Sequence, residues 1–388
     1  MSTLKVNAIR QTTATSDAVT LASDGTCTAK ITNNLSNKNL IINGGMRVAQ
    51  RGWTTTTGTG NFATYTLDRW KIATYATDQL NLTVTREAMN QAVPGFANYI
   101  KVSPNAAESA LAADEYTNLR YSIEAQDLQE LGYGTSSAKS LTLSFWVKSN
   151  TTGTACITFN KHDATSYYIT RTYTINSADT WEKKTVTIPG LTASGIANDT
   201  GIGLNIYWFL SAGSDYTSSD STSWVTAADS KYAYGHAINL TDSTSDYLAL
   251  TGVQLEVGDV ATDFEHRSYG DELLKCQRYY EHSYNTDVAP GSNSNVGGYY
   301  QSLTSDAGNN TVWSIEYKVQ KRAVPTMTFY RDNGTAGSWD FDGSSVSAGA
   351  HTVNGHRSSQ THLNAYMSVG ASWIPCWIYG HWTSSAEL

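Results

Sequence analysis

Pairs of acidic residues two or three positions apart are the candidates for catalysis in this sequence. Hydrolysis of a glycosidic bond requires two carboxyl groups placed across a sugar ring. The pairs of the right residue type are Glu124 and Asp127, Asp263 and Glu265, and Asp340 and Asp342. The last two pairs fall near predicted strand ends or turns, where acidic residues commonly cap and solvate the backbone. We therefore expect no catalytic residue and no enzymatic activity.

Aromatic side chains are the stronger signal, and the chemistry that they predict is sugar binding. Sugar rings pack their C–H faces on flat side chains, while Asn, Asp and Thr bond the hydroxyl groups. The predicted ligand-binding residues are Trp208, Trp224, Trp339, Trp373 and Trp377. The first two lie around a Ser-rich loop, and the other three lie in a C-terminal stretch dense in aromatic residues. For each of them the alternative stays open that the ring fills a core or a seam between subunits.

Motifs for other chemistries are missing. The sequence has no GxSxG turn for a nucleophilic serine, and no GxGxxG or GxxxxGK[ST] loop for a nucleotide. The four cysteines, Cys27, Cys156, Cys276 and Cys376, are scattered, without a CxxC pair or a His at ligand spacing. This pattern predicts buried or incidental thiols rather than a zinc site or a disulfide framework. We expect no cofactor and no metal.

The composition is typical of an extended β protein. Charged residues make up 15% of the 388 residues, well below the usual quarter, whereas the chain carries 24 Tyr and 11 Trp. The net charge is −8, and no run of Lys or Arg is dense enough to follow a phosphate backbone, which argues against a nucleic-acid partner. No apolar run could cross a bilayer, and the first residues lack the apolar region of a secretory signal. We expect a soluble protein, made in the cytoplasm, with no membrane insertion.

Strand patterns dominate residues 39–267. The clearest is SLTLSFWVKS, in which alternate residues from Leu141 to Val147 are apolar and the residues between them are mostly polar. We expect the first face in a core and the second in water. Further strand candidates are separated by Gly, Ser, Asn and Asp clusters at spacings that suit two packed sheets. The fold class predicted is all-β, with a β-sandwich (jelly roll) over this range.

The regions on either side complete the predicted organisation. Residues 1–38 carry short alternating stretches and a hairpin signal at Asp24 and Gly25, but they are too few to bury a core alone, so they predict an attachment or oligomerisation segment. Residues 268–283 have helical spacing behind Asp271, a possible N-cap, and predict a short helical linker. From 284 to 388 the alternation returns and predicts a smaller C-terminal β-sandwich.

Three stretches resemble bacteriophage tail-fibre proteins. NLIINGGMRVAQRG followed by TLDRW resembles the opening of their large domain; TGVQLEVGDVATDFEHRSYGDELLKCQRYY resembles its end and linker; GHWTSSAEL resembles their C-terminal ending. MSTLKVNAI is similar to the first residues of structural proteins from marine phages. The resemblance implies a jelly roll related to carbohydrate-binding modules, with the NLIING and VQLEVG strands near each other. Relatives often carry a calcium-binding acidic residue shortly after the Asn-Gly, whereas Gly45, Met46 and Arg47 stand here, so no calcium is expected there.

The resemblance implies a virion protein, located in a tail fibre or another external appendage. As a receptor-binding subunit it would attach the particle to a glycan or protein of the host surface. The family expectation is a homotrimer, joined through its N-terminal segment to other tail or capsid proteins, and burying sheet edges between subunits would protect them. Two alternatives stay open. One is an architectural capsid decoration or tail adaptor without a receptor, and the other is a glycan depolymerase.

Overall fold

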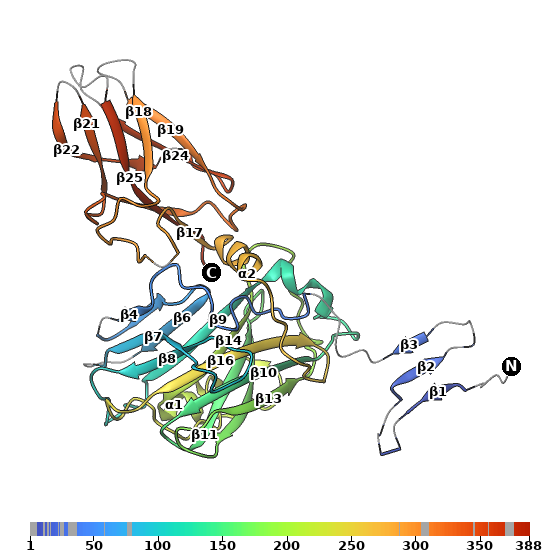
Figure 1. Ribbon diagram of the computed structural model, residues 1–388. Coiled ribbons are helices and arrows are strands. Elements are labelled where there is room, and N and C mark those ends of the chain that lie inside the picture. The colour runs from blue at the N-terminus through green and yellow to red at the C-terminus, as the bar shows by residue number, and fades with distance from the viewer. Residues whose placement is uncertain are drawn as a thin grey trace.

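The computed structural model describes residues 6–10, 12–13, 15, 17–21, 23, 27–29, 37–57, 59–75, 80–286, 288–303, 310–343, 346–355, 357–368 and 376–388. Within these residues nearly all regular structure is antiparallel β-sheet, which confirms the predicted all-β fold class. Three regions follow one another along the chain: a small N-terminal sheet, a large sandwich, and a smaller C-terminal β region (Figure 1).

The N-terminal region is a three-stranded antiparallel sheet. Its strands are β1 (Ala8–Ile9), β2 (Val19–Leu21) and β3 (Cys27–Ala29). Leu21 pairs with Cys27, as a hairpin between them requires, although the predicted turn residues Asp24 and Gly25 lie outside the described residues. The side chains of Ile9 and Leu21 are 55% and 40% exposed. This small sheet therefore presents apolar side chains to solvent.

Two facing sheets form the large region. The six-stranded sheet has the order β13–β10–β16–β8–β7–β4, with β4 (Thr54–Thr56), β7 (Leu82–Ala88), β8 (Asn98–Pro104), β10 (Leu141–Ser149), β13 (Glu182–Ile188) and β16 (Leu248–Val257). The seven-stranded sheet has the order β15–β12–β11–β14–β9–β6–β5, with β5 (Phe62–Tyr65), β6 (Trp70–Tyr75), β9 (Tyr116–Glu124), β11 (Gly153–Lys161), β12 (Tyr167–Ile175), β14 (Ile202–Ala212) and β15 (Val225–Thr226). The 3₁₀ helix η1 (Ala125–Leu131) follows β9.

Alternate residues of the strands build one core between these sheets. In β14 the side chains of Leu204, Ile206, Trp208 and Leu210 point inward and are completely buried. The Trp208 ring meets Phe145 of the opposite sheet edge-on, with 6.1 Å between ring centroids. Because successive side chains of a strand alternate between its faces, the intervening residues of β14 lie on the outer surface of the seven-stranded sheet.

The predicted wet face of β10 is largely covered. Its apolar face lies in the core as predicted, but Thr142 and Ser144 on the other face are also buried. The Thr142 hydroxyl donates to the carbonyl of Gly258 at 2.9 Å, and Gln254, beside Ser144 in the sheet, donates to the carbonyl of Asp263 at 3.1 Å. The chain that follows β16 thus crosses this face, a long-range contact that strand alternation does not encode.

The NLIING segment is not a strand, which corrects that expectation, yet it lies against β16 as the resemblance implied. The Leu40 N–H donates to Leu255, and the Val253 N–H donates to the carbonyl of Gly44, both at 2.9 Å. No ladder forms because the chain turns at Asn43, whose φ is +59°. Only glycine fits at position 44, since a Cβ there would lie 2.0 Å from the Val253 carbonyl oxygen.

The segment after β14 covers the centre of the outer surface of the seven-stranded sheet. It contains α1 (Ser214–Thr217) and the 3₁₀ helix η2 (Asp229–Lys231). Tyr216 packs edge-on against Tyr116, and Tyr232 against Phe209, each with 4.9 Å between ring centroids. Nearer the β5 edge, Tyr75 of β6 is 41% exposed. The outer surface of the seven-stranded sheet is therefore covered by this segment at its centre and exposed to solvent at Tyr75.

Helix α2 (Tyr269–Gln277) connects the two larger regions. The predicted linker of 268–283 is longer than the helix, because Tyr280–His282 forms strand β17 and pairs with the C-terminal strand. The N-cap is Ser268 rather than Asp271: the Ser268 hydroxyl oxygen accepts the Asp271 N–H at 3.1 Å. Asp271 lies in the first turn instead, where a carboxylate is favoured by the helix dipole.

The C-terminal region also consists of two sheets. The larger contains β17, β18 (Tyr299–Leu303), β20 (Thr326–Tyr330), β21 (Ser338–Gly343), β22 (Val346–Thr352) and β25 (Cys376–Ser385). The smaller has the order β19–β24–β23, with β19 (Asn310–Glu316), β23 (Asn354–Gly355) and β24 (His362–Ser368). Strand β25 pairs with β17, β18, β20 and β21. Side chains from both sheets, among them Trp339, Leu363 and Ile378, form its core.

Buried ion pairs join the large sandwich to the chain that follows it. The Glu387 carboxylate contacts the guanidinium groups of Arg69 and, at 3.1 Å, Arg51. The side chains of Arg69 and Glu387 are only 1% and 4% exposed. Arg278, just after α2, donates to the buried Glu124 carboxylate at 2.6 Å.

Candidate functional site

Two of the tryptophans predicted to bind a ligand are completely buried, which corrects that prediction. Trp208 lies in the core of the large sandwich and Trp339 in the core of the C-terminal region. The Trp339 indole N–H donates to the carbonyl of His381 at 2.7 Å, and its ring stacks on Trp313 with 5.0 Å between centroids. Both rings serve packing, because their positions in the strand alternation turn them inward.

Trp224 and Trp373 contribute no defined part of a site. Trp224 is half-buried against the large core, and its indole N–H donates to the carbonyl of Pro189 at 2.7 Å. Trp373 lies among residues 369–375, outside the described residues. Trp377 is different, since it is 39% exposed.

Trp377 is part of an exposed aromatic group on the larger C-terminal sheet. In β25, Trp377 and Tyr379 point to the outer surface, whereas Ile378 between them is completely buried. On the neighbouring strand β18, Tyr300 is directly opposite Tyr379 and is 64% exposed. The Tyr300 and Tyr379 rings lie 6.1 Å apart, centroid to centroid. Three aromatic rings thus lie next to one another on adjacent strands.

Carboxylates flank these rings on the opposite side of β25. In β21, Asp342 is directly opposite Trp377 and Asp340 is directly opposite Tyr379. Directly opposite residues place their Cβ atoms about 5 Å apart on one face of a sheet. We call Tyr300, Trp377, Tyr379, Asp340 and Asp342 the aromatic face. It offers flat apolar rings beside the exposed carboxylate of Asp342, whereas Asp340 is buried and paired with Arg331 at 2.6 Å.

The charges around the aromatic face keep its tyrosine a hydrogen-bond donor. Burial raises the pKa of Tyr379, and the carboxylates of Asp340, Asp342 and Asp332 raise it further. The Tyr379 hydroxyl is therefore protonated at neutral pH. Asp340 is fixed in place, because it accepts from Arg331 Nε at 2.7 Å and from the Asp332 N–H at 3.0 Å.

A cavity of about 290 Å³ extends the aromatic face past Tyr379. Its lining consists of Asn295, Gly298, Tyr299, Tyr300, Asp332 and Tyr379. Burial raises the pKa of Asp332, while His381 opposes this shift and Asp340 adds to it. Amide, hydroxyl and carboxyl groups therefore surround an opening next to the exposed ring of Tyr300 and the half-buried ring of Tyr379. This is the mixture of flat and polar groups that a sugar requires.

From sequence, Trp377 was predicted to bind a ligand and Asp340 and Asp342 were considered only as a catalytic pair, whereas Tyr300 and Tyr379 were not among the predicted site residues. The signal was present in the stretch CWIYGHW, because Trp377 and Tyr379 are two positions apart and a strand places such residues on one face. The contribution of Tyr300 depends on which strand lies next to β25. That pairing is a long-range property, and it could not be read from alternation within one segment.

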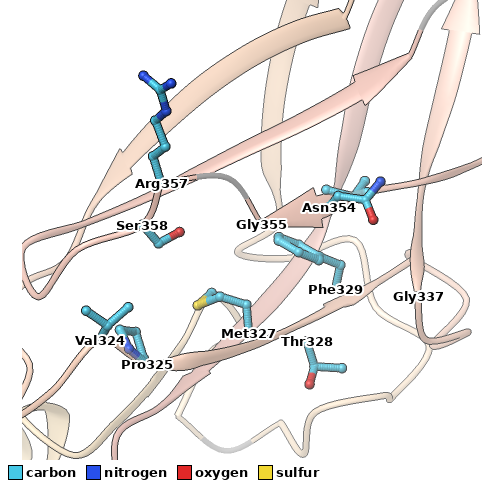
Figure 2. Close-up of a pocket in the computed structure, with 11 residues that line it drawn as sticks. Val324, Pro325, Met327, Thr328, Phe329, Gly337, Asn354, Gly355, Arg357 and Ser358 are labelled. Atoms are coloured by element: carbon cyan, nitrogen blue, oxygen red, sulfur yellow. The ribbon is translucent and has the colours of Figure 1, made fainter.

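A second hollow, of about 560 Å³, lies between β20 and β23. Figure 2 shows Met327 and Phe329 at its floor, with Val324 and Pro325 at one end. Arg357 points away from the hollow in this view. Its lining mixes apolar side chains with polar ones, and its one ring, Phe329, is buried. Without an exposed ring, this hollow suits a sugar less well than the aromatic face.

The other acidic pairs are engaged in structural contacts. Glu124 is completely buried and accepts from the Tyr279 hydroxyl at 2.8 Å as well as from Arg278. Glu265 accepts from the Asn39 N–H at 2.9 Å and pairs with Arg267 at 3.0 Å. These carboxylates hold segments of the large sandwich together, and neither pair lies beside the aromatic face.

The described residues contain neither a cluster of metal ligands nor a membrane-spanning helix. No three His, Cys, Asp or Glu side chains gather there as ligands for a metal ion. No described helix has the length and apolar character to cross a bilayer. Cys156 and Cys276 are free, buried thiols, and burial raises the pKa of both.

The chain is a two-sandwich all-β protein. No protein-family model matches it, and no curated protein does. Among solved structures, the enzymatically active domain of tailspike protein 4 of bacteriophage CBA120 is 13% identical, with a TM-score of 0.31 over 57% of this chain and 21% of that one. A putative sugar-binding protein from Bacteroides thetaiotaomicron is 11% identical, with a TM-score of 0.31 over 56% and 99% of the two chains. A family 11 carbohydrate-binding module from Clostridium thermocellum is 13% identical, with a TM-score of 0.27 over 54% and 100%.

The chain thus spans about a fifth of the tailspike domain's length. At TM-scores of 0.31 and below, these likenesses carry no inference about binding or catalysis.

Proposed function

We propose that the protein binds a glycan through the aromatic face and acts as the receptor-binding subunit of a bacteriophage tail fibre or other external appendage. The observation that carries the proposal is the row of Tyr300, Tyr379 and Trp377 beside Asp340 and Asp342. The phage setting is supported by the three tail-fibre-like sequence stretches. Host attachment would then depend on a few exposed rings in the C-terminal region.

The energetics favour a neutral, hydroxyl-rich ligand. A sugar ring that covers Trp377 removes apolar surface from water, at about 25 cal/mol for each Å² buried. Asp342 is exposed and accepts hydrogen bonds from hydroxyl groups, whereas it repels a ligand carboxylate or sulfate. Charge-assisted hydrogen bonds of this kind are roughly twice as strong as neutral ones. The aromatic face therefore selects against acidic sugars.

The first prediction concerns Trp377→Ala and Tyr300→Ala. Each variant removes a stacking ring, and we expect about tenfold weaker binding to any neutral glycan retained on an array, which corresponds to ~1.4 kcal/mol. Trp377→Phe keeps a flat ring and should retain most of the affinity. Trp53→Ala is the matched control, because Trp53 is 53% exposed on the large sandwich. Equal binding by wild type and both alanine variants would refute the role of the aromatic face.

We propose binding without cleavage, because Asp340 is already held by Arg331 and by the Asp332 N–H. The same binding experiment separates the alternatives when the bound glycan is analysed by mass spectrometry. Intact glycan agrees with a receptor-binding subunit, and shortened chains that disappear in Asp342→Asn would establish a depolymerase. Docking to purified particles without glycan binding would instead indicate an architectural adaptor.

We also propose that the subunit is a homotrimer, with residues 1–38 as its oligomerisation and attachment segment. The support is the small β1–β3 sheet, whose Ile9 and Leu21 side chains are exposed. Light scattering should give three times the chain mass for the full protein and the mass of one chain after removal of residues 1–36. Ile9→Ser with Leu21→Ser should weaken the trimer without unfolding the sandwich. A monomeric full-length protein would refute this proposal.

A further inference from the structure

Two basic side chains face each other on the outer surface of the seven-stranded sheet without an acidic partner. Lys71 of β6 is directly opposite Arg120 of β9 in the antiparallel register. Like charges at directly opposite positions destabilise a sheet. Most other basic groups nearby are paired, since Arg51 and Arg69 both contact Glu387. The Lys71 and Arg120 pair is therefore a local excess of positive charge in a chain of net charge −8.

Neither basic group satisfies its hydrogen bonds within the described residues. Arg120 donates from one terminal nitrogen to the Tyr232 hydroxyl at 3.2 Å, and its Nε is buried with no acceptor. Lys71 has no hydrogen bond or ion pair there, and its ammonium lies 5.2 Å from the centre of the Tyr65 ring. Buried donors normally find a partner. The Arg120 Nε is enclosed, so the Lys71 ammonium is the donor left open to an incoming anion, beside the positive charge of Arg120.

The electrostatic surroundings agree with this arrangement. Burial lowers the pKa of Lys71, and the neighbouring Arg120 lowers it further. Glu387 is the carboxylate that opposes this shift, and both of its oxygens are already bonded to Arg51 and Arg69. The groups around the Arg120 guanidinium are tyrosines, chiefly Tyr232 and Tyr207, which are uncharged at neutral pH because burial raises the pKa of both. An added anion would therefore relieve repulsion that the protein itself leaves uncompensated.

Tyrosine rings border the pair on both sides and along the strands. In one row across the sheet, Tyr65, Lys71, Arg120 and Tyr207 are successive neighbours, and the Arg120 guanidinium lies 4.7 Å above the Tyr207 ring. Four residues farther along the same strands, roughly 13 Å away, Tyr75 and Tyr116 stack with 6.1 Å between centroids. Tyr75 is 41% exposed. The exposed Tyr75 ring thus lies within the length of a short oligosaccharide from Lys71 and Arg120.

We propose that Lys71 and Arg120 form a binding subsite for the anionic group of an acidic glycan, either a carboxylate or a sulfate ester, whose adjoining sugar residues extend toward Tyr75. The guanidinium of Arg120 supplies the planar fork that matches such groups, and Lys71 adds a point charge. This site is separate from the aromatic face, where the exposed carboxylate of Asp342 repels anions. It gives the large sandwich a ligand chemistry of its own.

The test is calorimetric titration of the full chain with polygalacturonate, dextran sulfate and neutral dextran oligosaccharides. We expect binding of at least one acidic oligosaccharide and none of neutral dextran at this site, with affinity falling as salt rises. Lys71→Gln should weaken acidic binding about tenfold, because it removes a charge-assisted hydrogen bond. Arg120→Lys keeps the charge and loses the fork, so it should weaken binding as well. The carboxylated and sulfated probes show which anion the subsite prefers.

Matched controls keep this test distinct from that of the aromatic face. Lys183→Gln removes the same charge from an exposed position on β13 and should leave acidic binding unchanged. Trp377→Ala should likewise leave acidic binding unchanged. Thermal unfolding of each variant verifies that it is folded. If no acidic probe binds, or if Lys71→Gln and Lys183→Gln weaken binding equally, the subsite does not exist.

Discussion

One residue type has different roles in this protein, and its position in a strand decides which. Trp339 and Trp377 belong to paired neighbouring strands, yet Trp339 is completely buried and Trp377 is 39% exposed. Histidines likewise differ in how far their side chains are exposed. His282 is 4% exposed in β17, between the rings of Tyr280 and Tyr284, whereas His162 is exposed. A buried imidazole is favoured in its neutral form, so His282 links folding to pH.

We predict that the protein loses stability on acidification and that His282→Phe reduces this loss. Burial, helped by Lys318 and Arg51, lowers the pKa of His282 from 6.5 to about 4. Between these values the unfolded chain binds more protons than the folded one, so the stability present at neutral pH is lost as pH falls from about 6.5 to about 4. At pH 4.5 the effect is roughly 2.5 kcal/mol.

Chemical denaturation of wild type and His282→Phe at pH 7.5 and pH 4.5 measures this difference. Phenylalanine keeps a flat ring in the space between the two tyrosines. His162→Phe, at an exposed position, is the matched control. The prediction is wrong if His282→Phe and wild type lose equal stability on acidification.

At the level of elements, local patterns predicted which segments form strands. They did not predict which other segments of the chain cover those strands. The inward face of β10 follows from alternation alone, because period-two apolar residues have one buried side. Burial of Thr142 and Ser144 depends on the chain after β16 and is not encoded in β10. The NLIING segment has strand composition, but the left-handed turn at Asn43 overrides it. The N-cap of α2 is Ser268, three residues before the predicted Asp271, because the Ser268 hydroxyl accepts the Asp271 N–H.

The candidate site was less predictable than the fold. Single tryptophans could be named from sequence, but the face of the sheet on which each lies depends on register. The aromatic face requires the pairing of β18 and β21 with β25, and the Lys71 and Arg120 pair requires that of β6 with β9. Such pairings join residues far apart in sequence, and they are set by the packing of the whole sandwich.

At the scale of the molecule, the two large regions share a polar junction. Glu387 binds Arg51 and Arg69, Arg278 binds Glu124, and Arg322 donates to the carbonyl of Thr200 in the large sandwich at 2.7 Å. The chain end of the C-terminal region thus lies against the large sandwich near α2 (Figure 1). Removing the C-terminal region would leave Arg69 buried without its carboxylate. Point variants therefore test ligand binding more cleanly than truncation.

We predict that Glu387→Gln destabilises the protein by about 3 kcal/mol and separates the unfolding of its two large regions. Breaking one partner of a buried ion pair leaves an uncompensated charge, at a cost of about 3–5 kcal/mol. Differential scanning calorimetry should show one transition in wild type and two in the variant. Glu316→Gln, at an exposed position in β19, is the control. Unchanged stability in Glu387→Gln would show that these ion pairs do not couple the regions.

Strand β25 also determines when the C-terminal region can form during synthesis. Residues 376–385 pair with β17, β18, β20 and β21, whereas the last strand of the large sandwich ends at Val257. On the ribosome, the sandwich can therefore complete its sheets more than a hundred residues before β25 emerges. Until β25 emerges, the four strands that pair with it each keep an unpaired edge. During this interval the nascent chain is most prone to pair with a neighbouring copy.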